Sequence, residues 1–149
     1  MTATGHAVIG TIIAAKIGNP YLAVPIAFFS HIAADLFPHW DTATNIKTKG
    51  KKRVIVETLF DIAIGFFISY LIMVFLFPKT NPIYMFFIIL VSQSLDWFTA
   101  PYYFLQIKIP PFTWAYNFQK LFDNRLQAPW GIINQIAILT VLVVAAKLI

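Results

Sequence analysis

Histidine and carboxylate side chains are scarce in this chain, and several of them follow helical spacing. The sequence has three histidines and six acidic residues among 149. His31 and Asp35 are four residues apart, as are Glu57 and Asp61, so we expect each pair on one face of a helix. Neutral imidazole and carboxylate are the usual ligands of Zn²⁺ and similar ions. The spacing therefore favours a site for a divalent metal.

Five apolar runs must position these residues. Hydrophobic residues make up 59% of the chain and charged residues only 11%, whereas globular domains carry about a quarter charged residues. The runs cover approximately Gly5–Ile17, Tyr21–Phe37, Val54–Phe77, Ile83–Leu105 and Gly131–Ile149. Between the last two, Ile109–Pro129 mixes aromatic and basic residues, a pattern typical of the membrane–water boundary. We predict an all-α polytopic membrane protein, one domain over residues 1–149, with about five transmembrane or membrane-embedded helices plus an interfacial segment.

The distribution of lysine and arginine predicts the orientation. With five crossings, the segments after the second and fourth runs share one side of the membrane. That side holds Lys47, Lys49, Lys51, Lys52, Arg53, Lys108, Lys120 and Arg125, and the other holds Lys16, Lys79 and Lys147. The positive-inside rule places the richer side in the cytoplasm. We expect a multi-pass protein of the plasma (inner) membrane with a cytoplasmic N-terminus and an external C-terminus.

In this orientation nearly all histidines and acids gather at the cytoplasmic ends of the helices. His6 opens the first helix, and Asp96 lies about three turns before the end of the fourth, whereas Asp123 falls apart from the others in the interfacial segment. His39 follows the helix-breaking Pro38. A charge in the bilayer core costs several kcal/mol unless it is paired or hydrated. Because the apolar runs contain no internal lysine or arginine, we expect one or two divalent ions, zinc or else manganese, to neutralise the carboxylates.

Roles follow from these positions. The expected metal ligands are His6, His31, Asp35, His39, Asp41 and Asp61. Glu57 or Asp96 is the expected catalytic base, and Lys52, Arg53 or Arg125 could hold a phosphate. Two alternatives stay open at this point. An isolated intramembrane acid can serve packing or proton transfer, and some acids could pair with Lys51, Lys52 or Arg53.

The motif His31-x-x-x-Asp35-x-x-Pro38-His39-x-Asp41 resembles the signature of small prokaryotic membrane proteins similar to the YdjM-like membrane-bound metal-dependent hydrolases. Thr2, Gly5 and His6 match the start of those proteins. A looser likeness exists to zinc-dependent phospholipase C. The resemblance extends through Asp41, and beyond it only hydropathy is similar. Where that family has a second histidine-rich motif after the basic loop, this chain has Glu57 and Asp61. The resemblance implies metal-dependent hydrolysis.

Together these observations favour a metal-dependent hydrolase at the cytoplasmic membrane face, acting on a lipid or phosphoester. We expect membrane lipid, and no nucleic acid, as its partner. The alternatives are an ion- or metal-coupled transporter or channel subunit and a non-catalytic metal-binding membrane module. A transport pathway needs polar groups at several depths, but Ser69 and Thr140 are nearly the only ones in the outer halves of the runs. That one-sidedness favours a site over a pore.

Overall fold

The computed structural model describes residues 1–149 and is built from helices joined by turns and loops. A single isolated bridge, His39 to Arg125, is its one β-type pairing. The helices are α1 (Ala3–Lys16), α2 (Pro20–Leu36), α3 (Ile46–Lys49), α4 (Lys51–Leu76), α5 (Pro82–Ser92), α6 (Ser94–Leu105), α7 (Phe112–Gln119) and α8 (Trp130–Leu148). The prediction of an all-α fold is confirmed, and the helices follow the predicted apolar runs.

Two helices, α4 with 26 residues and α8 with 19, are long and apolar enough to cross a membrane. A third candidate is the pair α5 and α6, which passes only if it is counted as one span bent by 52°. Helix α2 is apolar but has 17 residues, and α1 has 14. Two to three candidate spans therefore fit membrane association, a smaller number than the five predicted helices.

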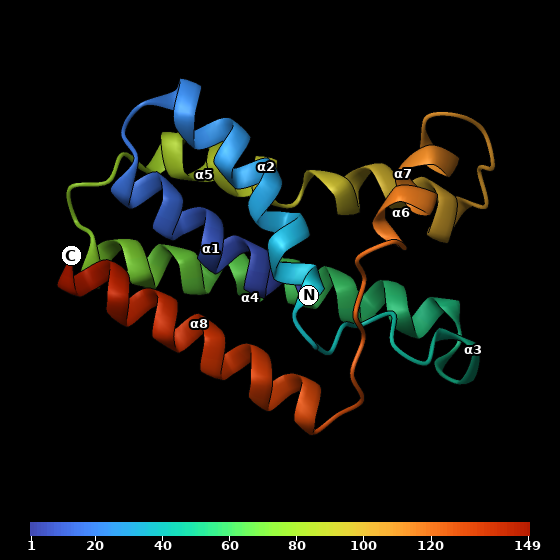
Figure 1. Ribbon diagram of the computed structural model, residues 1–149. Coiled ribbons are helices and arrows are strands. Elements are labelled where there is room, and N and C mark those ends of the chain that lie inside the picture. Colours follow the sequence, from blue (N-terminus) through green and yellow to red (C-terminus); the bar gives the residue numbers. More distant parts are fainter.

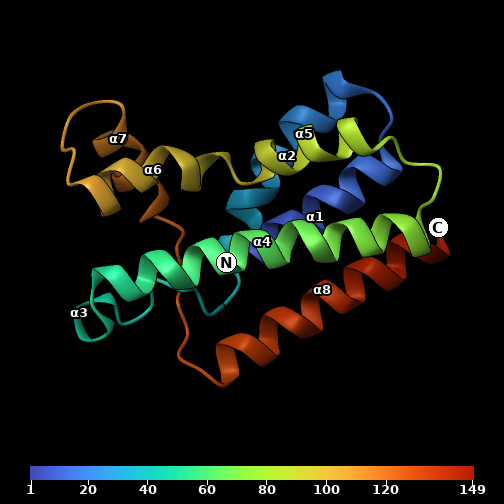
Figure 2. The same cartoon turned by 180° about the vertical axis from the view of Figure 1, so that it is seen from behind.

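Helix α1 lies at the centre of the bundle and contacts α2, α4, α5 and α8. Figure 2 shows α4 in front of α1, with α8 running beside it. Two glycines allow this close packing. A Cβ atom on Gly10 would lie 3.0 Å from the Cα of Ile89 in α5, and one on Gly65 of α4 would lie 2.9 Å from the Cα of Thr4. Since these distances are too short for any side chain, α1 touches both neighbours almost backbone to backbone.

The N-terminal end of α1 is held by polar contacts. The Thr2 hydroxyl accepts a hydrogen bond from the Gly5 amide at 3.1 Å and caps the helix. Asp61 of α4 accepts from the Ala3 amide at 2.6 Å and from the Thr4 hydroxyl at 2.7 Å. Carboxylates stabilise helix N-termini because the first amides lack partners and carry partial positive charge. These contacts fix the turn of α1 that carries His6.

The fourth predicted run is broken at Gln93, where α5 ends and α6 begins at a sharp angle. After the break, the Asp96 amide donates to the Gln93 carbonyl at 3.0 Å, a contact between residues three apart. The carbonyl of Ser92, which a continuous helix would pair with Asp96, is therefore free to accept from elsewhere.

The segment after α6 folds back onto α6 and onto the end of α2. Helix α7 packs on α6, with the Tyr102 and Tyr116 rings stacked at 4.1 Å, and Figure 1 shows the two helices together at one end of the molecule. Beyond α7, the main chain pairs with the end of α2. Asn124 donates to the Asp35 carbonyl at 3.0 Å, and Leu126 donates to the His39 carbonyl at 2.6 Å.

Candidate metal centre

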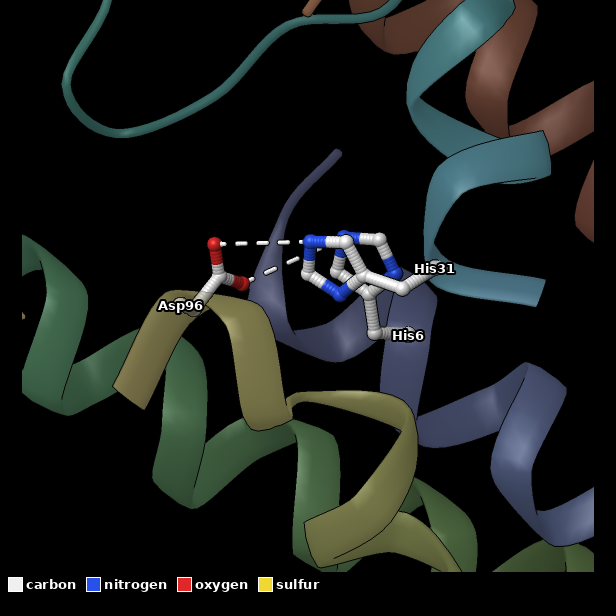
Figure 3. Close-up of side chains that lie close together, drawn as sticks. All are labelled: His6, His31 and Asp96. Carbon is white, nitrogen blue, oxygen red and sulfur yellow. Dashed lines mark ion pairs between the residues drawn. The ribbon is translucent and has the colours of Figure 1, made fainter. Parts of the chain in front are cut away.

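Three helices bring the first group of ligands together. The ligand atoms of His6 (α1), His31 (α2) and Asp96 (α6) all lie within 4.8 Å of one another. Figure 3 shows the two imidazoles lying parallel, with the Asp96 carboxylate facing their edges. The ring centroids are 3.9 Å apart, and the Asp96 oxygens are 3.7 Å from His31 Nε2 and 4.0 Å from His6 Nε2. The predicted convergence of these residues is thus present in the structure.

Asp35 lies at the centre of the cluster and is 1% exposed. Its Oδ1 is 3.3 Å from His6 Nε2 and 3.9 Å from His39 Nε2, and its Oδ2 is 3.3 Å from His31 Nε2. The amino group of Met1 also contacts Oδ1. One buried carboxylate is therefore close to all three histidines of the chain.

The hydrogen bonds of the histidines decide which ring nitrogen faces the carboxylates as an acceptor. His31 Nδ1 is 2.8 Å from the Ser92 carbonyl freed by the helix break, and His39 Nδ1 is 2.8 Å from the Phe37 carbonyl. A carbonyl only accepts, so each Nδ1 is the donor, and in the neutral ring Nε2 then carries a lone pair. His39 Nε2 has no hydrogen-bond donor and faces carboxylate oxygens, so a cation is needed between them, either a proton or a metal ion. This arrangement of second hydrogen bonds is usual for metal-binding histidines.

Gln119 at the end of α7 covers the first group. Its side-chain amide donates to Asp96 Oδ1 at 2.7 Å and lies 3.3 Å from His31 Nε2. Gln119 belongs to the segment predicted to be interfacial, and it was not predicted to be a site residue. Its contact depends on the fold of α7 onto α6, which spacing along the chain does not reveal.

A second group lies next to the first and is formed by loop segments outside the helices. The ligand atoms of His39, Asp41 and Asp123 lie within 4.8 Å of one another. His39 Nε2 is 3.4 Å from Asp123 Oδ1. The prediction that Asp123 stays apart from the other acids is wrong, because the main-chain pairing of residues 124–126 with the end of α2 carries it to His39.

Arg125 supplies a positive charge to the second group. Its Nε is 2.8 Å from Asp123 Oδ2, and its guanidinium Nη2 is 3.2 Å from Asp41 Oδ2. Burial opposes the charge of Arg125, but Asp41 and Asp123 raise its pKa above the usual value. Arg125 is therefore a fixed positive charge that binds both carboxylates.

Other predicted site residues lie outside both groups. The Asp61 carboxylate binds the start of α1. Glu57 forms ion pairs with Lys49 at 2.8 Å and Arg53 at 2.7 Å, in agreement with the alternative that some acids pair with the basic loop. Arg53 is largely exposed. Lys52 lines the same surface depression as Arg53 and Glu57.

A cavity of about 210 Å³ opens beside the two groups. Asp41, Asp96, Gln119 and Arg125 provide polar lining at the ligand clusters. Its apolar wall comes from α4 and α6 and consists of Ile55, Leu59, Ile62, Trp97, Ala100 and Phe104. The cavity is therefore amphipathic, since both carboxylates and hydrocarbon side chains line it.

The donor set could hold a metal ion, since buried imidazole nitrogens and carboxylates converge and the His6 ring nitrogens and His39 Nε2 have no hydrogen-bond partner. Comparisons with known proteins add no assignment. No family model matches this chain, and neither a curated protein nor a solved structure is significantly similar to it. The chemistry must be inferred from the geometry of the cluster.

Proposed function

We propose that this protein is a metal-dependent hydrolase that acts on a lipid or phosphoester at the cytoplasmic face of the membrane. The observation that carries the proposal is that Asp35 and Asp96 both face the imidazoles of His6 and His31 beside a cavity that Asp96 lines. His6, His31 and Asp35 would hold a divalent ion, most simply zinc, with manganese as the second choice. Asp96, although it lies close to both imidazoles, would stay off the ion and face the water in the cavity. When bound, such an ion would polarise the scissile group and make water more acidic.

Asp96 is the best candidate for the catalytic base. Its side chain is 38% exposed and lines the cavity, whereas Asp35 is almost fully buried. A base must reach the water from which it takes the proton, and Gln119 orients the Asp96 carboxylate by donating to Oδ1. Glu57, the other base predicted from the sequence, is neutralised by two cations and does not line this cavity.

The walls of the cavity support a lipid substrate. Leu59 and Trp97 line it and are also exposed on the outside of the helices, at 61% and 42%, so an acyl chain could extend from the cavity along their surfaces. Burial of apolar area contributes about 25 cal/mol per Å². Lys52 and Arg53 would attract the headgroup at the membrane surface, because Arg125 is already engaged by two carboxylates.

The proposed membrane arrangement has five embedded helices, α1, α2, α4, the bent pair α5–α6, and α8, with α7 at the interface. The arrangement of cations supports it. Lys16, Lys79 and Lys147 line one groove together, at the end of the bundle opposite α3 and α7 (Figure 1). The basic residues of the segments after α2 and α6 lie toward the other end, so the charge asymmetry favours a cytoplasmic N-terminus and an external C-terminus.

The test uses the purified full chain in vesicles of an anionic phospholipid. We expect headgroup or phosphate release that stops on chelation, returns on addition of Zn²⁺ or Mn²⁺, and is lost in His31→Ala. Gln127→Ala, whose side chain pairs with Asn45 at the surface, serves as a folded control with unchanged release. No release from the parent, together with metal-dependent ion flux across the vesicles, would replace the hydrolase with a transporter.

A further inference from the structure

We propose that the cluster holds two divalent ions, the second bound by His39, Asp123 and Asp41, with Asp35 shared between the two. This inference rests on the proposed function, because it extends the same metal centre. It also narrows the substrate class, since paired metal ions are a common arrangement for phosphoester hydrolysis.

His39 gives the main support. The side chain is 0% exposed and its Nε2 has no hydrogen-bond partner. Because Nδ1 donates to the Phe37 carbonyl, Nε2 of the neutral ring is an acceptor. The groups that face it are Asp123 Oδ1 at 3.4 Å and Asp35 Oδ1 at 3.9 Å, which are also acceptors. A buried acceptor left without a donor is costly, and a cation between these three atoms would satisfy all of them.

The carboxylates of the second group are arranged for such a cation. Arg125 binds Oδ2 of Asp123 and leaves Oδ1 facing His39. Asp41 is held by Arg125 through Oδ2 and by the Ala43 amide through Oδ1, so it would close the outer side of the site with a remaining lone pair. Arg125 thus positions both acids, as outer groups around metal sites commonly do.

Asp35 joins the two groups. Its Oδ1, which also contacts the amino group of Met1, is 3.3 Å from His6 Nε2 and 3.9 Å from His39 Nε2, and its Oδ2 is 3.3 Å from His31 Nε2. One carboxylate that approaches ligands of both groups is in the position of a bridging ligand. A single ion bound by the first group would not explain why the unpartnered Nε2 of His39 also faces Asp35.

The experiment counts ions in the full chain, purified in detergent, stripped with chelator and titrated with Zn²⁺. We expect two tightly bound ions per chain in the parent and in Glu57→Gln, a matched change of an acid outside both groups. His39→Ala and Asp123→Asn should each retain one. With Mn²⁺, electron paramagnetic resonance should show spin coupling in the parent and an uncoupled signal in both variants.

Circular dichroism and melting curves establish that each variant is folded, and Asp123→Asn replaces only one atom if His39→Ala fails to fold. A parent that saturates at one ion, lost in His31→Ala but kept in His39→Ala, would overturn the second ion and leave the proposed function intact. A parent that binds no ion would overturn both proposals. Two ions in folded Asp123→Asn with unchanged affinity would also reject this ligand set.

Discussion

The two ligand groups are built in different ways. The first takes His6, His31 and Asp96 from three helices, whose relative positions are set by close packing around α1. The second takes His39, Asp41 and Asp123 from loop segments, which are held by main-chain hydrogen bonds between the end of α2 and residues 124–126. Ligands on packed helices are held rigidly, whereas ligands on loops depend on a few local contacts. We therefore expect the first group to bind an ion more tightly than the second.

The largest effect should follow from Asp35→Asn, because Asp35 is the one residue close to both groups. We expect the affinity for both ions to fall at least about 100-fold, since a ligand contributes more than its outer-sphere partners, whose loss typically costs 10–100-fold. Isothermal titration with Zn²⁺ measures this. Loss of one ion with undiminished binding of the other would show that the groups share no ligand.

A smaller loss of metal affinity is expected from Gln119→Ala, and this loss should affect only the first group. Gln119 contacts Asp96 and His31 but no residue of the second group. The affinity for the first ion should fall by about 10-fold while that for the second stays unchanged. The matched variant Gln127→Ala should behave as the parent in the same titration. An equal loss of affinity for both ions would mean that α7 supports the whole cluster.

The smallest effect on metal binding is expected from Asp61→Ala, which should nevertheless lower the stability of the fold. Asp61 caps α1 and lies outside both groups. Removal leaves amides and a hydroxyl without their partner and should cost about 1–3 kcal/mol of stability, seen as a lower melting temperature of the metal-free protein. Metal content should stay at the parental value. Loss of an ion would return Asp61 to the ligand set predicted from the sequence.

The regular part of this architecture could be predicted from the sequence. The apolar runs correspond to helices, and the four-residue spacing of His31 and Asp35 correctly places both side chains in one cluster. His6 and Asp96 were also predicted as site residues, because they lie among the few histidines and acids gathered toward one end of the predicted helices. These features depend on local periodicity, which is readable in one sequence.

The remaining features depend on contacts between distant segments. Asp123 and Gln119 join the site only because the chain after α6 folds back, and no local pattern encodes that return. The break at Gln93 falls on three polar residues, Ser92 to Ser94, but contains neither glycine nor proline, so no helix-breaking residue marks it in the sequence. Asp61 carries the same helical spacing as a ligand pair, but its carboxylate binds amides of α1 instead.

The unequal lengths of α1 and α4 have a consequence for the surrounding lipid. α1 has 14 residues and α4 has 26, or about 21 Å and about 39 Å at 1.5 Å per residue. A hydrocarbon core about 30 Å thick is longer than α1 and shorter than α4, but α1 is enclosed by α2, α4, α5 and α8. In the proposed membrane arrangement, lipid would therefore meet the excess length of α4 and not the short length of α1. Because Ala3 of α1 binds Asp61, ten residues into α4, the Thr2–His6 end would lie up to about 15 Å deeper than the start of α4. Lipid phosphates would have to move below the usual headgroup level to reach the ligands, and a thinner membrane would shorten that distance.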